Sequence, residues 1–185
     1  MKRVLKKIKW IFEKKKLKKI GKNVHIGKNY VLLNPTNIEI GENFSASDNF
    51  RIRTWEKYNN KDTGFKPLVK IGDNVTFNDN CFISCLNEIN IGNGCLFGDN
   101  VFITDNYHGD TSKDILDIPP LERGLVTKGK TIIGNNVWCG RNVSILSGIS
   151  IGNNVIIGAN AVVTHDFEDN VVIAGVPAKI IKKIN

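Results

Sequence analysis

The chain has 185 residues, a length that suits one domain of ordinary core size, and a formal net charge of +8. Most of this charge is local, because residues 1–19 carry ten basic residues and one acidic residue, whereas the rest carries 16 basic and 17 acidic residues. A surface built for nucleic acid across the whole protein therefore has no support, and no nucleic-acid partner is expected.

Residues 1–19 are expected to form a basic amphipathic helix. Apolar residues recur there at helical spacing, with lysines on the other face: Val4, Leu5, Ile8, Ile11 and Phe12. Two roles stay open: the apolar stripe packs on the protein or a neighbour, or the helix lies on an anionic membrane surface. No apolar run approaches ~18 residues, and a signal-peptide core is lacking. We expect a cytoplasmic protein, with peripheral contact at the inner membrane face as the alternative.

A six-residue repeat begins after this helix. Blocks of six start with Ile-Gly at Ile20 and Ile26, and a third block at Ile40 is offset by two residues. Residues 50–69 break the pattern with polar and aromatic side chains and a proline. An irregular excursion with two short strands and a loop is expected there.

The repeat resumes at Ile71 and reaches Ile103 with one shift of two residues. Ile103 and Ile133 are thirty residues apart, a multiple of six, so the phase before residues 105–130 matches the phase after them. A loop inserted into an otherwise continuous coil produces such a match. Residues 105–130 are long and unpatterned for a compact domain, which is typical of a functional or disordered loop.

The clearest repeat runs from Ile133 to Val163. Five blocks of six begin with an aliphatic residue or cysteine, four have Gly second, and four have Asn fourth. A period of six fits neither a helix nor an alternating strand, and it indicates a coil that turns a corner every six residues. Gly and Asn suit the corners, because they accept positive φ most readily. Three blocks close one triangular turn of a parallel β-helix, which buries its faces against the next turn.

The remaining features are the cysteines and the tail. Cys81, Cys95 and Cys139 occupy small or aliphatic repeat positions, and the spacing to Cys85 lacks a second ligand pair, so reduced core thiols are expected. In the tail, Pro177 disfavours further sheet pairing, which predicts a short cap over the open end. The β-helix domain would thus span residues 20–185, with excursions at 50–69 and 105–130.

Over about residues 20–184 the chain resembles the hexapeptide-repeat acyltransferases, in particular the sugar and polysaccharide O-acetyltransferases that include the maltose and galactoside enzymes. Three motifs carry the resemblance: Thr104–His108, Ile133–Gly140 and Ala174–Lys179. It implies an all-β, left-handed parallel β-helix, an exception to the right-handed crossover rule. It also implies acetyl-CoA as co-substrate, no metal, and a homotrimer with each active site between two subunits.

The resemblance also assigns catalytic roles. His108 would be the general base, since imidazole can take the proton of an attacking hydroxyl near neutral pH. The backbone N–H of Arg141 would stabilise the oxyanion of the tetrahedral intermediate. Asp105 could orient His108, although an Asp in a loop is equally a turn former. Asn80 and Tyr107 are the expected contacts to the acceptor.

The same resemblance predicts a groove for acetyl-CoA along the outside of the coil. The residues expected to line it are Trp138, Ala159, Thr164, Lys179 and Lys182. The two lysines would approach the nucleotide phosphates as mobile point charges, unless they are only solubilising tail residues. His165 stands where relatives often have Lys, so that phosphate contact is not carried over.

The expected function is acetyl-CoA-dependent O-acetylation of a sugar or sugar-linked acceptor, in surface polysaccharide biosynthesis. Acetylation of an amine on a nucleotide-linked amino sugar and a non-catalytic scaffold are the alternatives. Zinc chemistry on the same fold needs three clustered histidines, whereas His25, His108 and His165 are far apart in the sequence.

Overall fold

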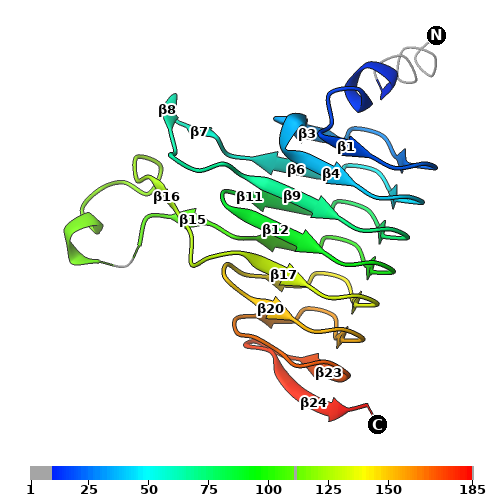
Figure 1. Ribbon diagram of the computed structural model, residues 1–185. Coiled ribbons are helices and arrows are strands. Elements are labelled where there is room, and N and C mark those ends of the chain that lie inside the picture. Colours follow the sequence, from blue (N-terminus) through cyan, green and yellow to red (C-terminus); the bar gives the residue numbers. More distant parts are fainter. Residues whose placement is uncertain (1–9, 111, 185) are drawn as a thin grey trace.

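The computed structural model describes residues 10–110 and 112–184. The chain winds through stacked coils, each made of short strands that pair in parallel with their equivalents in the neighbouring coils (Figure 1). Three sheets, named A, B and C here, run along the stack. Sheet A comprises β1 (Lys19–Ile20), β4 (Ile38–Ile40), β9 (Leu68–Ile71), β12 (Glu88–Ile91), β17 (Thr131–Ile133) and β20 (Ser150–Ile151).

The other two sheets follow the same order. Sheet B comprises β2 (His25–Ile26), β5 (Ser45–Ala46), β10 (Thr76–Phe77), β13 (Leu96–Phe97), β18 (Trp138–Cys139), β21 (Ile156–Ile157), β23 (Val171–Ala174) and β24 (Lys179–Lys183). Sheet C comprises β3 (Val31–Leu33), β6 (Arg51–Thr54), β11 (Phe82–Cys85), β14 (Phe102–Thr104), β19 (Ser144–Ile145) and β22 (Val162–Val163). The chain turns from A to B at the first corner, from B to C at the second, and from C to A at the third.

Inward side chains stack from coil to coil and form the core. Ile71, Ile91 and Ile133 follow one another in register on sheet A and are almost fully buried. On sheet B the rings of Phe77 and Phe97 stack with centroids 4.2 Å apart. All four cysteines are buried free thiols, and burial raises the pKa of Cys81 to about 11.

The first and second corners follow the repeat. Asn136, Asn142, Asn154 and Asn160 all adopt positive φ, between 56° and 62°. Their side chains form ladders, as where the Asn142 amide donates to Asn160 Oδ1 at 2.9 Å. Glycine is required beside them, since a Cβ on Gly134 would lie 2.6 Å from the backbone of the next coil. The coil and corner pattern predicted from the repeat is therefore confirmed.

Two boundaries differ from the prediction. Residues 10–14 are helical, but β1 begins at Lys19, because Leu17 is buried against the core and Lys18 already bonds to Ile38 of the next coil. The predicted helix therefore ends too late, and its residues 1–9 lie outside the described part. The first excursion is shorter than 50–69, because Arg51–Thr54 form β6. None of the described helices is long and apolar enough to cross a bilayer.

The tail also differs from a simple cap. After a turn that contains Pro177, the chain reverses and β24 pairs antiparallel with β23. Sheet pairing therefore resumes after the proline, which occupies the turn and removes no ladder hydrogen bond. The hairpin lies at the C-terminal end of the stack (Figure 1).

Candidate active site

Both excursions leave the coil at the third corner and lie on the same side of the molecule (Figure 1). The first carries the hairpin of β7 (Lys57–Tyr58) and β8 (Lys61–Asp62), and the second the pair β15 (Tyr107–His108) and β16 (Leu125–Val126). The second also contains the short helix η2 (Lys113–Ile115), whereas η1 (Pro35–Asn37) lies earlier at the same corner.

The two excursions contact each other directly. Tyr58 Oη donates to the carbonyl of Leu121 at 3.2 Å, and Asn59 Nδ2 donates to the same oxygen at 2.6 Å. A cleft of about 590 Å³ lies between them, lined by Lys61 and Thr63 on one side and by Arg123 on the other. The third corner thus carries a concave polar surface.

His108 lies at the edge of this surface. Its side chain is exposed, and its backbone pairs with Leu125 across the second excursion. Tyr58 Oη is 3.1 Å from His108 Nδ1, and the two rings meet edge to face at 5.4 Å. Trp55 supports Tyr58 with a second edge contact at 5.9 Å and donates its Nε1–H to Ser84 Oγ. An exposed imidazole held at one nitrogen is suited to general-base chemistry.

Asp105 does not take the orienting role that was considered for it. The residue is fully buried, and its carboxylate accepts the backbone N–H groups of Leu86 at 2.6 Å and Asn87 at 2.8 Å. The Cys85 thiol, whose pKa is raised by burial, lies 3.4 Å from the same carboxylate. Asp105 therefore stabilises the neighbouring third-corner turn, and Tyr58 occupies the position at His108 Nδ1.

The base of the second excursion is held by further polar contacts. Ser147 Oγ donates to the carbonyl of Asp105 at 2.6 Å and accepts the Lys128 N–H at 3.0 Å. Tyr107 is half-buried, and its ring lies 5.8 Å from Lys128 Nζ. Burial raises the pKa of Tyr107, and the nearby charge of Asp110 adds to that effect. These contacts fix the start and the end of the excursion relative to the coil.

Arg141 lies at the second corner, in the coil that follows the second excursion. In the first coils this corner is capped, since Lys28 N–H donates to Asp48 Oδ1 at 2.7 Å and Asp48 N–H to Asp79 Oδ1 at 3.0 Å. The residue beneath Arg141 in the next coil is Ala159, which has no acceptor oxygen in its side chain. Within the described part of the chain, the N–H of Arg141 consequently has no hydrogen-bond partner.

The other expected residues lie at the second corner, on sheet B and near the C-terminal end of the coil. Asn80 is an exposed second-corner residue whose Oδ1 accepts the Asn49 amide at 2.9 Å. Trp138 is 53% exposed on sheet B, where it lies between Leu96 and Ile156 in register. The side chains of Thr164, Lys179 and Lys182 are exposed as well.

His25 and His165 are exposed. His165 packs against Phe167 with ring centroids 4.4 Å apart, and its Nδ1 lies 3.2 Å from Thr164 Oγ1. Neither residue contacts His108 among the contacts of the described residues.

One chain does not bring the expected catalytic set together. His108 and Tyr107 lie at the third corner, whereas Arg141, Asn80 and Ala159 lie at the second corner, across sheet C. No hydrogen bond or ring contact joins the two groups within residues 10–110 and 112–184. Sheet C thus separates the two groups within one chain.

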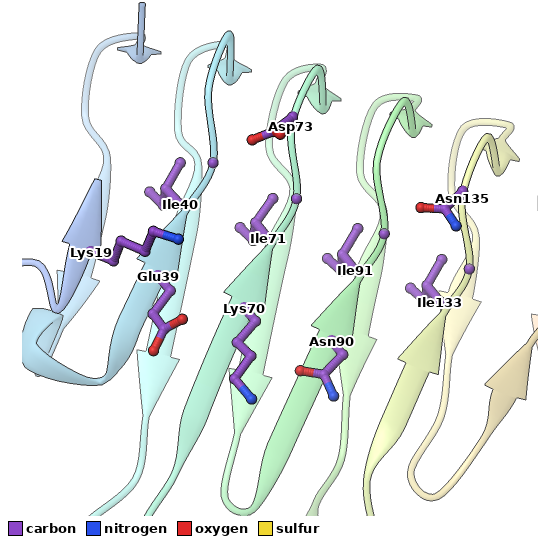
Figure 2. Close-up of a pocket in the computed structure, with 14 residues that line it drawn as sticks. Lys19, Glu39, Ile40, Lys70, Ile71, Asp73, Asn90, Ile91, Ile133 and Asn135 are labelled. Carbon is purple, nitrogen blue, oxygen red and sulfur yellow. The ribbon is translucent and has the colours of Figure 1, made fainter. Parts of the chain in front are cut away.

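A second concave surface lies at the first corner and contains none of the expected residues. This groove has a volume of about 450 Å³. Figure 2 shows that Ile40, Ile71, Ile91 and Ile133 repeat there along successive coils. The glycines between them lack side chains because the next coil occupies that space. The groove is thus a product of the repeat, and the expected site residues lie elsewhere on the molecule.

Sequence reasoning identified the excursions but not the contact between Tyr58 and His108. The only signal was the presence of aromatic residues in an otherwise polar excursion. That signal gives no partner, because the two residues are fifty positions apart.

Known proteins resemble this chain in sequence and in structure. Residues 130–165 match the family model "Bacterial transferase hexapeptide (six repeats)". The Escherichia coli (strain K12) protein named "Putative lipopolysaccharide biosynthesis O-acetyl transferase WbbJ" is 40% identical over 156 residues, which are 82% of this chain and 74% of that protein. A structure of galactoside acetyltransferase with coenzyme A is 30% identical, with a TM-score of 0.51, and covers 87% of this chain and 65% of its own.

A further solved structure shows the fold. AntD, an N-acyltransferase from Bacillus cereus, has a TM-score of 0.75 at 23% identity and covers 96% of this chain and 88% of its own. Together these likenesses show that the chain belongs to the hexapeptide-repeat acyltransferases. The predicted fold class, an all-β left-handed parallel β-helix, and the predicted enzyme class, an acetyl-CoA-dependent acyltransferase, are confirmed.

Proposed function

We propose that the protein transfers the acetyl group of acetyl-CoA to a hydroxyl of a sugar during surface polysaccharide biosynthesis, with His108 as the general base. The observation that carries the proposal is the exposed imidazole of His108, held at Nδ1 by Tyr58 beside the cleft between the excursions. The similarity to a protein named for O-acetyl transfer in lipopolysaccharide biosynthesis supports the choice of acceptor.

The chemistry needs a general base and a donor for the oxyanion. His108 Nε2 takes the proton of the acceptor hydroxyl as its oxygen attacks the thioester carbonyl, which typically contributes about 10²–10⁴-fold to the rate. The Arg141 N–H donates to the oxyanion that forms on the carbonyl oxygen. When the carbonyl re-forms, the C–S bond breaks, and the thiolate of CoA takes the proton from the imidazolium. An O-acetylated sugar and free CoA leave.

The distribution of these groups supports an active site between subunits of a homotrimer. The third corner of one subunit would supply His108 and Tyr107, and the second corner of its neighbour would supply Arg141 and Asn80. A heterologous contact of this kind closes into a ring when the rotation between subunits permits it. Asp105 has no direct part in this scheme and acts as a structural residue.

Acetyl-CoA would lie along the outside of the coil. The residues proposed to contact it are Trp138, Ala159, Thr164, Lys179 and Lys182. The exposed indole offers an apolar wall, and the two exposed lysines of β24 offer positive charge for the phosphates. Calorimetry should show that replacing both lysines with alanine weakens acetyl-CoA binding, and unchanged affinity would remove them from the site.

The main test is steady-state acetyl transfer to a panel of sugars by the wild type, His108→Ala and His25→Ala. His108→Ala should lower kcat by at least about 10² without loss of stability, since the side chain is exposed. His25→Ala removes another exposed histidine, from β2, and should leave kcat unchanged. Full activity of His108→Ala would reject the assignment. Amino sugars in the same panel would reveal N-acetylation, which an amine undergoes with less help from a base.

A further inference from the structure

We propose that Tyr58 is a positioning residue that holds His108 in the tautomer with its proton on Nδ1, and so leaves the lone pair on Nε2 for the acceptor. The inference rests on the proposed role of His108 as the base. Its starting point is the hydroxyl of Tyr58, which lies 3.1 Å from His108 Nδ1 and 3.2 Å from the carbonyl oxygen of Leu121.

The direction of the two hydrogen bonds follows from the number of protons. A phenol has one proton to donate, and a carbonyl oxygen can only accept. Tyr58 therefore gives its proton to Leu121, and the bond to His108 forms only if Nδ1 donates to the phenol oxygen. The neutral imidazole then has no proton on Nε2. The other arrangement, with Tyr58 donating to Nδ1, would protonate Nε2 and lose the bond to Leu121.

The surroundings of Tyr58 restrict it to this orientation. Its ring is packed edge-on against Trp55, whose Nε1–H is bound to Ser84 and whose carbonyl accepts the Thr63 hydroxyl at 2.8 Å. The carbonyl of Leu121 is fixed in turn by the amide of Asn59 at 2.6 Å, which uses its other lone pair. The accepting carbonyl is thus held by Asn59 of the opposite excursion, and the phenol ring is held by Trp55 of its own excursion.

The arrangement also suits the charged state of the base. When His108 becomes imidazolium, Nδ1–H continues to donate to Tyr58, and Tyr58 continues to donate to Leu121. No hydrogen bond has to reverse during proton transfer, so the site is preorganised for the charge that develops. Among the described residues, no carboxylate hydrogen-bonds to His108, so this function falls to the phenol.

The direct test is ¹⁵N NMR of the His108 imidazole in the wild-type protein, at a pH where the ring is neutral. The shifts should show Nδ1 protonated and Nε2 bare. A majority of the Nε2-protonated form would overturn the proposal, and this measurement needs no variant that has to fold.

Tyr58→Phe tests the consequence, because it removes only the hydroxyl. We expect kcat to fall about tenfold with KM little changed, as part of the general-base contribution is lost, and the Nδ1-protonated form to lose its dominance in the spectrum. Asn59→Ala is the comparison variant, since it loosens the same carbonyl but keeps the Tyr58 hydroxyl, so its loss of kcat should be clearly smaller than that of Tyr58→Phe.

The outcomes separate this inference from the proposed function. If Tyr58→Phe keeps full activity and the wild-type tautomer while His108→Ala is inactive, Tyr58 has no positioning role and the base assignment stands. If His108→Ala is fully active, the proposed function itself fails. Equal losses of kcat in Tyr58→Phe and Asn59→Ala would mean that only attachment of the loop matters, which also overturns the proposal.

Discussion

The first two corners of the coil and the third corner reverse the chain by different means. At the first two corners, Gly and Asn recur with the repeat, and ladders of Asn side chains connect successive coils. At the third corner the chain leaves the coil twice, and a buried carboxylate together with contacts between the two excursions replaces the ladder. A repetitive corner gives stability from local sequence, and an irregular corner gives a shaped surface with a histidine on it.

The largest expected effect comes from giving the Arg141 N–H at the second corner the side-chain acceptor that it lacks. Ala159→Asn should place an acceptor oxygen beside the Arg141 N–H, as Asn93 Oδ1 does for Asp73 N–H at 2.7 Å. Removal of one oxyanion donor typically costs about 10²–10³ in kcat, and the measurement is kcat with acetyl-CoA binding by calorimetry. Ala159→Val fills similar space without an acceptor. Equal activity of the Asn and Val variants would remove the Arg141 N–H from the mechanism.

The next effect concerns the carboxylate that replaces the ladder. Asp105→Ala should lower the free energy of unfolding by about 3 kcal/mol, because two buried N–H groups lose a charged acceptor. Asp48→Ala removes an acceptor at a half-exposed second corner, where water can replace it, and should cost about 1 kcal/mol or less. Denaturant unfolding measures both. Similar costs would mean that burial does not distinguish the two corners.

A pair of glycines gives a smaller contrast. Gly134→Ala should lower the free energy of unfolding by about 1–3 kcal/mol, since its Cβ would lie 2.6 Å from the backbone of the next coil. The clash is not easily relieved, because the two coils are joined by strand pairing. Gly124 lies in the second excursion, where a Cβ would have no atom within 4 Å, so Gly124→Ala should be nearly neutral. Thermal unfolding of the two variants gives the comparison, and equal shifts in Tm would contradict the close packing of the regular corner.

The smallest effect is at the end of the second excursion. Glu88 on sheet A bonds to Lys130 at 2.6 Å and to Lys70 at 3.1 Å, and the hydrogen bond from Lys130 is the main reason that its pKa is lowered to about 2. A lowered carboxyl pKa contributes stability above the ordinary value of 4.5, and this contribution is lost as pH falls toward 2.

Glu88→Gln should therefore lower the free energy of unfolding by about 1 kcal/mol or less at neutral pH. Between pH 4.5 and 2 the variant should lose less stability than the wild type. Unfolding curves across that range provide the measurement. Parallel losses in wild type and variant would show that the ion pairs contribute nothing.

The regular part of the fold was predictable because its determinants are local and repeat. In each block from Ile133 to Val163, the repeat position indicates which residue points inward and where the corner lies, so both can be predicted from the sequence. Arg51–Thr54 escaped this prediction, because buried Ile52 and Thr54 alternate with two arginines and no Gly-Asn follows them. Its strand pairing is set by β11, which lies a coil away.

The candidate site was predictable only in part, for the same reason. His108 could be located, because it begins an excursion whose ends keep the phase of the repeat. Its partner Tyr58 lies fifty positions earlier, and the acceptor role of Asp105 depends on Leu86 and Asn87, nineteen and eighteen positions away. Contacts between two irregular segments produce no repeating pattern in the sequence from which they could be predicted.

The central claim is that the third corner of one subunit and the second corner of another act on the same acceptor. The most direct measurement is the activity of mixed trimers made by co-expressing differently tagged His108→Ala and Ala159→Asn chains, each expected to lose about 10²-fold or more in kcat alone. With random assembly, roughly a quarter of the sites combine an intact His108 with an intact Arg141 donor, so about a quarter of wild-type activity should return. Mixtures of His108→Ala with Tyr58→Phe, both altered at the third corner, should show no gain. Mixed trimers as inactive as their parents would contradict the claim.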